Sequence, residues 1–583
     1  MPWRSVPAAD RGTGRDPASL ARLRRPPPPS VTTPAPTSAT ATAPSASAKT
    51  PWLLLFALTA IAALLRAPLL DRPVWFDEAC MSDQRIGTTA QWLATLYVDI
   101  HPPLFVSFMH FWNGWFGDGE VAMRTPALLS GLLSVPLTWW VGSRLVGGRA
   151  ALIAAALLAL SPVHAWYCAE ARLYAPMVLC TLLAFGCVDR LTDETCAHRR
   201  LLFWLHAANV AVMLALHYYL SVYVAMLTAL APVLRRGGGP RVRGLLWLHG
   251  AGLALLSGFL LVKIKLGQFE TSQGYLTALD GEKLFDFVFS WAWTGDTLQA
   301  TANPALESLG VGFVWLGVGL VTLGTGAVLA RAPRRPRGLL VPIGVLTLPL
   351  FLLACALVGL DRTFLERTMI AALPFVFLLA AAGLEVLPGL AMRAATGATL
   401  AVAATALAAL YATYDSAWTL YKPHPDWRSA AAYLGSEIDA GHAGAPVFTS
   451  MPNPRSLSYY DARIQDAKNL EVQVQPSDIS AKLAPLVGEG FAETARALFE
   501  DFAANNRKLL ADAAMVVQRC RPRPDQLELP PSYDGPCYVV RNHWHPHVTV
   551  DDSVEALLAD PQVEVLHTAS WNGVTISKVR IGK

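Results

Sequence analysis

Long apolar runs, separated by short polar segments, dominate the chain between residues 51 and 414. Each run approaches the roughly 20 residues that an α-helix needs to cross the hydrocarbon core of a bilayer. The apolar positions in each run are nearly continuous and do not alternate with polar ones. The pattern predicts about eleven transmembrane helices, at residues 52–70, 122–143, 148–163, 171–188, 201–216, 218–234, 245–265, 308–330, 339–358, 368–386 and 396–414.

The two ends of the chain follow other patterns. Residues 1–50 are rich in Pro, Ala, Ser and Thr and poor in large apolar side chains, which predicts a disordered cytoplasmic tail. A cleaved signal peptide is the alternative, but the run that follows is longer than a secretory h-region and favours a retained anchor. Beyond residue 414, short apolar runs alternate with turns and amphipathic segments. We therefore expect a transmembrane domain at 51–420 and a soluble α/β domain at 421–583.

Composition supports this class of protein. The 583 residues are 53% hydrophobic and only 15% charged, with a mean hydropathy of +0.36. These values predict a polytopic α-helical membrane protein. The formal net charge of +4 is small, so the overall charge gives no support to a nucleic-acid partner.

The charged residues of the loops are distributed unevenly. The basic loops contain Arg144 with Arg149, Arg199 with Arg200, and the segments 235–243 and 331–337. The positive-inside rule makes these loops cytoplasmic. The segment 268–304 is acidic, with Lys283 as its one basic residue. Eleven crossings from a cytoplasmic start would place Asp77, Glu170 and the C-terminal domain on the extracytoplasmic side.

The first predicted outer segment has an adjacent pair of carboxylates, Asp77 and Glu78 in "WFDEA", followed by His101 in "DIHPPLF". Most such pairs are solvated loop charges. Here Trp75 and the aromatic residues at 112–115 predict interfacial helices around the pair. A carboxylate held at the interface is partly desolvated, so the pair predicts a general base or ligands for a divalent cation.

Two further motifs fall at predicted outer mouths of helices. Glu170, Arg172 and Tyr174 occur in "YCAEARLYA", and His217 occurs in "LHYYL". Charged groups at a membrane mouth are costly unless they are paired or functional, so the first motif predicts part of a site. An ion pair between Glu170 and Arg172 that joins two loops is the structural alternative. An aromatic belt would explain the tyrosines beside His217 without catalysis.

Arg362 and Arg367, in "LDRTFLERTM", precede the tenth predicted helix on the outer side. Arginine at this position runs against the positive-inside bias, which indicates a compensating anion. A lipid phosphate would fit, because the guanidinium group matches phosphate oxygens in a bidentate manner. Salt bridges to Asp361 or Glu366 are the alternative.

These motifs together resemble a known family. The order "WFDEA", "HPPLF", "RTPALLSGLLSVPL", "LSPVHAWYCAEARLYA", "LHYYL" and "ERTMIAALPFVFLLAAAGLE" resembles the bacterial branch of the GT-C glycosyltransferases. This class contains protein O-mannosyltransferases and lipid A aminoarabinose transferases. The resemblance extends from residue 51 to about 420 and implies a GT-C transmembrane catalytic domain.

The resemblance also implies roles for single residues. Asp77 resembles the acidic residue of the family's first outer loop, which implies the base that deprotonates the acceptor hydroxyl, with Glu78 supporting it or helping to bind a cation. Arg367 resembles the arginine that faces the lipid phosphate. Many relatives have an aromatic residue where Thr368 stands, a departure that affects the pocket. The predicted substrate-binding residues are His101, Glu170, Arg172, Tyr174, His217, Arg362 and Arg367.

The resulting functional prediction is a glycosyltransferase at the outer face of the bacterial cytoplasmic membrane. It would move a sugar from a polyprenyl-phosphate donor to a hydroxyl or phosphate of a glycolipid, polysaccharide or protein acceptor. A single displacement with inversion follows if Asp77 acts as a base. A divalent metal ion, held by Asp77 and Glu78, is the one cofactor considered.

Two other classes remain open at this stage. A transporter or flippase of a lipid-linked glycan would have a similar number of helices, but the sequence shows no internal repeat of the kind many transporters have. A non-catalytic membrane scaffold would not explain why acidic, basic and histidine residues gather in the same outer loops.

Overall fold

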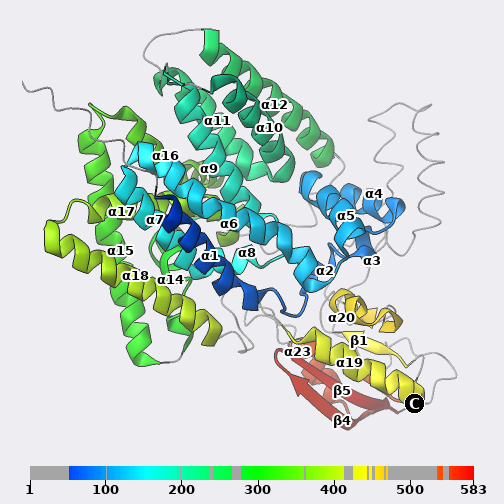
Figure 1. Cartoon of the computed structure of the whole chain (residues 1–583). Helices are drawn as coiled ribbons and strands as arrows, with labels where there is room; N and C mark the ends of the chain where they lie inside the picture. Colours follow the sequence, from blue (N-terminus) through cyan, green and yellow to red (C-terminus); the bar gives the residue numbers. More distant parts are fainter. Residues whose placement is uncertain are drawn as a thin grey trace, which may run out of the picture. The chain divides into compact units, whose positions relative to one another are not determined.

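The computed structural model is predominantly helical (Figure 1). It describes residues 51–99, 101–193, 195–196, 198–234, 240–265, 278–301, 303–359, 363–412, 425–442, 445–449, 454–464, 468–469, 535–542 and 551–582. The predicted tail, residues 1–50, and the candidate residue Arg362 lie outside these ranges.

Nine helices of the described ranges are long and apolar enough to cross a membrane. They are α1 (Trp52–Arg66, continued by η1, Ala67–Leu69), α6 (Glu120–Leu145), α9 (Tyr174–Leu191), α10 (Arg199–Leu216), α12 (Pro240–Lys265), α15 (Pro304–Arg331), α16 (Leu340–Leu357, preceded by η5, Pro336–Leu339), α17 (Leu373–Leu384, preceded by η6, Glu366–Ala372) and α18 (Gly389–Ala412). The bent pair α7 (Gly148–Leu160) and α8 (Pro162–Cys168) makes a tenth span if it is counted as one. The shorter apolar helix α11 (Tyr218–Leu234) matches the remaining predicted run. Each of the eleven predicted segments therefore coincides with a helix or a bent pair, and the chain is a multi-pass membrane protein.

The helix α17 forms the centre of the bundle. The apolar segment Glu366–Leu384 is 94% buried inside the protein, whereas the corresponding windows of α1 and α12 are only 22% and 11% buried. Two glycines allow α17 to pack closely against α15. A Cβ on Gly324 would lie 1.8 Å from the Leu379 carbonyl oxygen, and one on Gly383 would lie 2.1 Å from the Leu320 carbonyl oxygen. Larger side chains would separate the two helices.

The break between α7 and α8, where the axes bend by 61°, is held by an arginine. Arg66 donates hydrogen bonds to the carbonyl oxygens of Ala159 and Leu158 at the end of α7, at 2.9 and 3.3 Å, and to His164 Nδ1 at 2.9 Å. The hydroxyl of Ser161 accepts from the His164 N–H and caps α8. Cationic donors satisfy the carbonyl groups that a helix end leaves without partners. The bend places residues 169–173 at the mouth of the bundle, before α9.

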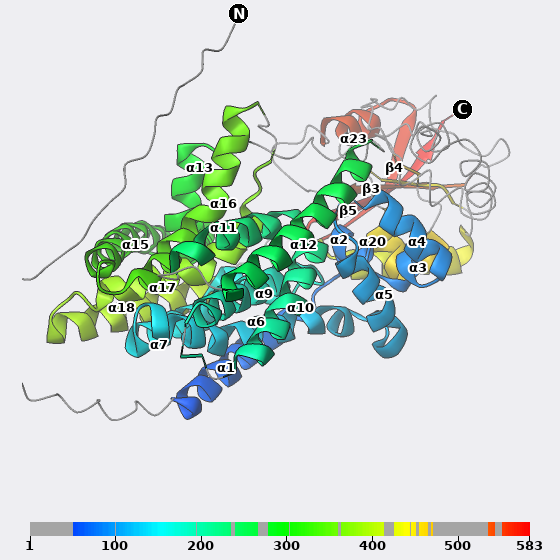
Figure 2. The ribbon, with the colours of Figure 1, turned by 90° about the horizontal axis from the view of Figure 1, so that it is seen from above.

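The segment between η1 and α6 contains four short helices, α2 (Phe76–Ala79), α3 (Asp83–Ile86), α4 (Thr89–Val98) and α5 (Leu104–Phe116), drawn in blue in Figure 2. The outer face of α5 exposes Phe108, Phe111, Trp115 and Phe116. An apolar aromatic face of this kind fits the headgroup boundary of a bilayer. The interfacial helices predicted around the carboxylate pair are present.

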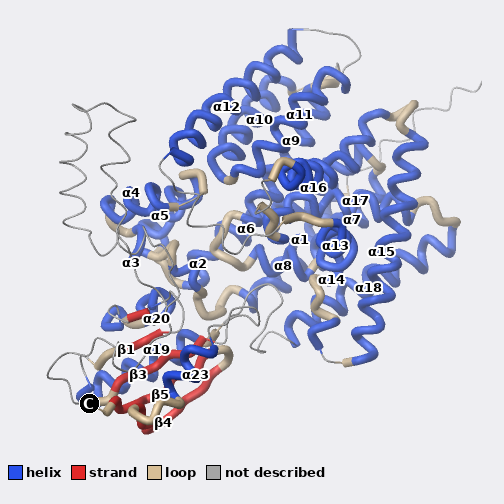
Figure 3. The backbone as a smooth tube through the Cα atoms, turned by 180° about the vertical axis from the view of Figure 1, so that it is seen from behind, coloured by secondary structure: helices blue, strands red, loops and turns tan. Residues whose placement is uncertain are grey.

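The C-terminal part contains one mixed five-stranded sheet, whose strands lie together in Figure 3. The order is β2-β1-β3-β5-β4, with β1 parallel to β2 and β3, and β5 antiparallel to β3 and β4. The strands are β1 (Val447–Thr449), β2 (Lys468–Asn469), β3 (Cys537–Asn542), β4 (Val563–Trp571) and β5 (Val574–Ile581), and the helices are α19 (Trp427–Glu437), α20 (Pro454–Tyr460) and α23 (Asp551–Leu558). Asn572 and Gly573, the latter at φ +68°, connect β4 to β5 in a two-residue hairpin loop.

The side chains of Trp427, Leu434, Leu457, Tyr538 and Ile576 form a core between the sheet and helices α19 and α20. The predicted α/β character of this part is therefore confirmed. The proposed domain limits at residues 50 and 420 stay predictions.

Candidate active site

Asp77 lies between two arginines that come from distant parts of the sequence. It occupies the first turn of α2, and its Oδ2 is 3.9 Å from Nε of Arg172 and 4.0 Å from Nη2 of Arg367. These distances are too long for hydrogen bonds. The Nε atoms of both arginines are buried and have no hydrogen-bond partner among the described residues. A buried guanidinium with unused donors is the kind of group that an anionic ligand satisfies.

Glu78, the neighbour of Asp77, is fully buried and has a different set of partners. Arg124 of α6 donates to its two carboxylate oxygens at 2.8 and 2.6 Å, and the Ala171 N–H donates at 2.8 Å. Burial raises the pKa of Glu78, but Arg124, Arg72 and the Ala171 amide outweigh burial and hold the pKa below its ordinary value. These contacts join the segment of Asp77 to the segment of Arg172.

Arg124 also binds backbone carbonyl groups of the residues that precede Asp77 in the sequence. Its Nη1 donates to the carbonyl oxygens of Leu70 and Arg72, both at 2.7 Å. Its Nη2 also donates to the Pro73 carbonyl oxygen at 3.3 Å, so one buried guanidinium satisfies a carboxylate and three carbonyl groups. This arrangement fixes the chain path that leads from η1 to Asp77.

A second polar group lies beside Arg172. The ring and backbone N–H of His101 contact Asp99 Oδ1 at 2.7 and 2.8 Å, and the His101 and His217 rings lie 5.6 Å apart. Burial raises the pKa of Asp99, but His101 and Arg172 outweigh burial, so the pKa lies below its ordinary value. Burial, His101 and Arg172 all lower the pKa of His217 well below its ordinary value. Lys263 at the end of α12 donates to the Asp99 carbonyl oxygen at 2.6 Å.

Aromatic side chains line the other side of the arginines. The Arg367 guanidinium lies 5.8 Å from the centre of the Tyr174 ring, and Tyr174 packs edge-on against Tyr167 at 5.0 Å. The Arg172 N–H donates to the Glu170 carbonyl oxygen at 2.6 Å, which forms the turn before α9. The ion pair that the structure gives to Arg172 is with Asp77.

The structure thus brings together all the sequence-predicted site residues that it describes: Asp77, Glu78, His101, Glu170, Arg172, Tyr174, His217 and Arg367. Arg362 is the one candidate outside the described ranges.

Sequence reasoning missed three residues at the site, namely Arg124, Asp99 and Lys263. Each had a usable signal. Arg124 is a charge inside an otherwise apolar helix, Asp99 is two residues before His101, and Lys263 lies at the end of an apolar run. The partners of Arg124 and Lys263 could not be identified from sequence because both bind groups on other elements, whereas Asp99 binds His101 in its own loop.

The two carboxylates predicted as metal ligands have different partners in the structure. Glu78 is occupied by Arg124, and Asp77 faces two guanidinium groups whose positive charge opposes a divalent cation. Within the described ranges, no group of three His, Cys, Asp or Glu side chains is placed to hold a metal ion. A metal requirement of the protein stays a prediction.

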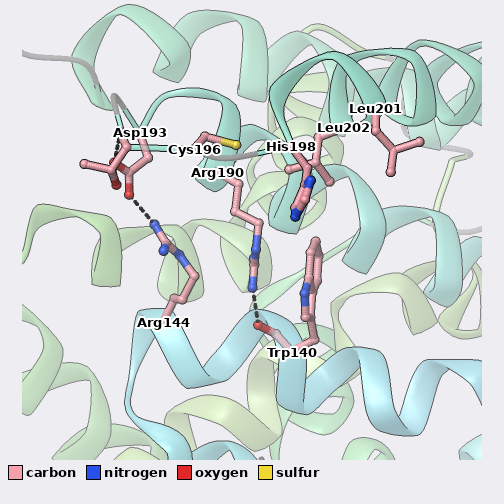
Figure 4. Close-up of a pocket in the computed structure, with 9 residues that line it drawn as sticks. Trp140, Arg144, Arg190, Asp193, Cys196, His198, Leu201 and Leu202 are labelled. Atoms are coloured by element: carbon pink, nitrogen blue, oxygen red, sulfur yellow. Dashed lines mark hydrogen bonds and ion pairs between the residues drawn. The ribbon is translucent and has the colours of Figure 1, made fainter. Parts of the chain in front are cut away.

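The opposite ends of α6 and α9 form a basic cluster (Figure 4). Arg144 donates to Asp189 at 2.5 Å and to Asp193 at 2.7 Å, and Arg337 pairs with Asp189 at 3.0 Å. Arg190 stacks on Trp140, with the guanidinium 3.4 Å from the ring centre. A cavity of about 360 Å³ lies beside them. Several of the basic segments that the sequence assigned to one side therefore meet at one end of the bundle.

Comparisons with known proteins agree with this fold. Residues 100–263 match the family model described as dolichyl-phosphate-mannose-protein mannosyltransferase. The structure of ArnT from Cupriavidus metallidurans in the apo state superposes with a TM-score of 0.52 at 14% identity, covering 91% of this chain and 98% of ArnT. The structure of the same ArnT bound to undecaprenyl phosphate gives a TM-score of 0.51 at the same identity and coverage. No curated protein sequence matches the chain.

The likeness to ArnT covers nearly the whole of both chains and shows that the two proteins share a fold, in agreement with the fold predicted from the motifs. The family model, which matches residues 100–263, agrees with the predicted class of membrane glycosyltransferase.

Proposed function

We propose that this protein transfers a sugar from a polyprenyl-phosphate donor to an acceptor hydroxyl or phosphate at the outer face of the bacterial cytoplasmic membrane. The observation that carries the proposal is the placement of Asp77 within 4.0 Å of two arginines, Arg172 and Arg367, whose buried Nε atoms have no hydrogen-bond partner among the described residues. Breaking the bond between a sugar and a phosphate needs a base for the acceptor and positive charge for the leaving group. One cluster offers both.

In the proposed step, the Asp77 carboxylate accepts the proton of the acceptor hydroxyl. The acceptor oxygen then attacks the anomeric carbon of the sugar. The bond from that carbon to the phosphate oxygen breaks, and its electron pair remains on the departing polyprenyl phosphate. A single displacement of this kind inverts the anomeric centre.

Arg172 and Arg367 are proposed to hold the phosphate of the donor. A guanidinium offers several N–H donors in a fixed plane, which suits the oxygens of a phosphate and stabilises the charge that develops on it. Undecaprenyl phosphate bound to a protein of the same fold supports a lipid-linked donor here. Because a bound phosphate would share the guanidinium charge with Asp77, donor binding would also leave that carboxylate better able to accept a proton.

The other predicted residues take supporting roles in this proposal. Glu170 and Tyr174 lie beside Arg367, on the side where the sugar would be held, and His101 and His217 lie on the Arg172 side. Glu78 was expected to assist catalysis or bind a cation. Its contacts with Arg124 and Ala171 support a role in positioning the loop of Asp77.

The test compares polyprenyl-phosphate sugars and envelope glycans by mass spectrometry in cells with and without the protein. Cells without the protein should accumulate one polyprenyl-phosphate sugar and lack the corresponding glycan modification. Cells that make only the Asp77→Asn variant should show the same accumulation, because loss of a general base costs about 10²- to 10⁴-fold in rate.

The matched control is Asp83→Asn, an exposed carboxylate six residues further along the same segment, which should restore the wild-type profile. Equal protein levels in the membrane fraction are required for each variant. An unchanged lipid profile without the protein, or full function of Asp77→Asn, would overturn the proposal. Export of an intact lipid-linked glycan would instead favour the transporter class.

A further inference from the structure

The chain segment that leads to Asp77 is held from two sides. On one side Arg124 of the transmembrane bundle binds the carbonyl oxygens of Leu70 and Arg72. On the other side lies α20 of the C-terminal domain, which packs against α2 (Figures 1 and 2). On this second side, two side chains of the C-terminal domain, Tyr460 and Arg428, form hydrogen bonds with residues 71–74.

Tyr460, the last residue of α20, makes the central contact. Its hydroxyl accepts a hydrogen bond from the Val74 N–H at 2.7 Å, three residues before Asp77, and donates one to Glu120 Oε1 at 3.0 Å. The hydroxyl is therefore both acceptor and donor in one chain of hydrogen bonds. Burial raises the pKa of Tyr460; the hydrogen bond from Val74 lowers it, but burial and the nearby Glu120 carboxylate outweigh that bond, so the pKa lies above its ordinary value and the phenol keeps its proton.

Arg428 of α19 completes the arrangement. It donates to Glu120 Oε1 at 2.8 Å and to Asp71 Oδ1 at 2.9 Å. Asp71 and Val74 both belong to the short stretch between η1 and α2. Two elements of the C-terminal domain thus bind this stretch, and both also bind Glu120 at the start of α6.

We infer that the C-terminal domain is a working part of the active site, in which Tyr460 and Arg428 are positioning residues that set the place of Asp77. This inference rests on the proposed transferase function. The base must lie within hydrogen-bond reach of the acceptor hydroxyl, and a displacement of about 1 Å can cost up to a hundredfold in rate. The six residues 70–75 between η1 and α2 form no helix or strand of their own, so side chains from both domains hold them in place.

The chain contains a matched control for Tyr460. The preceding residue, Tyr459, is on the same helix, and its hydroxyl donates at 2.7 Å to the carbonyl oxygen of Asp118. Asp118 lies in the loop between α5 and α6, outside residues 70–78 that lead to and include Asp77. Tyr459→Phe and Tyr460→Phe therefore remove one hydroxyl each from adjacent positions, but only Tyr460→Phe releases the Val74 amide.

The experiment measures hydrogen exchange, ligand binding and donor turnover in the full-length protein. In Tyr460→Phe, the amides of residues 71–78 should exchange about tenfold or more faster, while Tyr459→Phe leaves this peptide unchanged. Affinity for undecaprenyl phosphate should stay within about twofold of wild type, because the variant leaves Arg172 and Arg367, the proposed phosphate-binding residues, unchanged. Turnover of the polyprenyl-phosphate donor should fall by about tenfold in Tyr460→Phe only.

The double variant Tyr460→Phe, Glu120→Gln should lose less donor turnover than the product of the fold-losses of the two single variants. Both substitutions act through one hydrogen-bond chain, so their effects are not independent. Unchanged exchange at residues 71–78 in Tyr460→Phe, or equal turnover in the two tyrosine variants, would overturn the inference. Absence of donor turnover in the wild-type protein would reject the proposed transferase, and the exchange data would still show whether Tyr460 holds the loop.

Discussion

At the scale of single residues, the site is defined by how its charges are paired. Glu78 and Arg124 are both buried and are joined by two short hydrogen bonds. Each charge is therefore neutralised by the other, and the pair has a structural role. Arg172 and Arg367 are also close to a carboxylate, but at 3.9 and 4.0 Å from Asp77 they keep donors for another partner. The two adjacent carboxylates of α2 thus differ in their effect. The ion pair of Glu78 fixes the path of the chain, and the two longer contacts of Asp77 leave a place for an anion.

This difference predicts how substitution of Arg172 or Arg367 affects binding of the lipid phosphate. Arg367→Gln should weaken binding of undecaprenyl phosphate by about tenfold or more, because a charge-assisted hydrogen bond contributes about 1.5–3 kcal/mol. Arg172→Gln should act in the same direction. Native mass spectrometry of the purified protein with added undecaprenyl phosphate measures the change.

Arg149→Gln, at the basic end of the bundle, provides the comparison and should bind the lipid as wild type does. If all three variants retain the lipid equally, the phosphate is held elsewhere.

His217 predicts a dependence of stability on pH. Its pKa in the folded protein lies well below the ordinary value of 6.5, so the folded state leaves the ring uncharged while the unfolded state binds a proton below about pH 6.5. Stability contributed by neutral His217 is therefore present above pH 6.5 and declines as the pH falls, by at most about 1.4 kcal/mol per pH unit.

Thermal unfolding of wild type and His217→Gln at pH 7.5 and pH 5.5 measures this contribution. The advantage of wild type over the variant should shrink in acid. A constant difference between the two proteins at both pH values would show that the ring gains its proton in the folded state as well.

At the scale of elements, the bend between α7 and α8 decides where the second part of the site lies. A straight continuation of α7 would carry residues 169–173 away from Asp77. Arg66 compensates the carbonyl groups that the bend exposes, and Arg72 does the same at the end of α8, where it donates to the Ala169 carbonyl oxygen at 2.5 Å. Both arginines belong to the same N-terminal stretch, so one segment shapes the path of two half-helices.

The bend predicts that Arg66→Leu is strongly destabilising. The variant removes the donor for two buried carbonyl groups and for His164, each of which costs about 1–3 kcal/mol when left without a partner. We expect a lower unfolding temperature and loss of donor turnover together. Arg149→Leu, an arginine in the first turn of α7, should leave both unchanged.

At the scale of the whole molecule, the two ends of the bundle differ in chemistry. One end gathers Arg144, Arg190 and Arg337 around two aspartates, and the other gathers Asp77 with its arginines. The positive-inside rule assigns the first end to the cytoplasm, which would place the site and the C-terminal domain on the far side of the membrane.

Labelling in intact cells tests this orientation. A cysteine introduced at Ser436, in the C-terminal domain, should react with a membrane-impermeant maleimide, whereas one at Thr195, in the basic cluster, should react only after the membrane is opened. The number of maleimide groups attached to each variant, minus the number attached to the wild-type protein, shows whether the introduced cysteine reacted. The reverse pattern would invert the orientation and with it the proposed cellular site of transfer.

The sequence by itself determined the helical segments, the separation of basic from acidic loops and most of the residues that form the site. These properties are local, because hydropathy along a run sets a membrane span and the charge of a loop follows from its own residues. Glu78 shows the limit of this reasoning. The pair Asp77 and Glu78 looks equivalent in sequence, and both were candidates for catalysis.

Only the tertiary structure decided that the two carboxylates differ, since Glu78 meets an arginine 46 positions away while Asp77 meets Arg172 and Arg367. The same holds for Tyr460, whose contact with Val74 joins positions 386 residues apart. Which side chains meet depends on how helices bend and pack around α17, and that packing is a property of the whole chain and not of any segment within it.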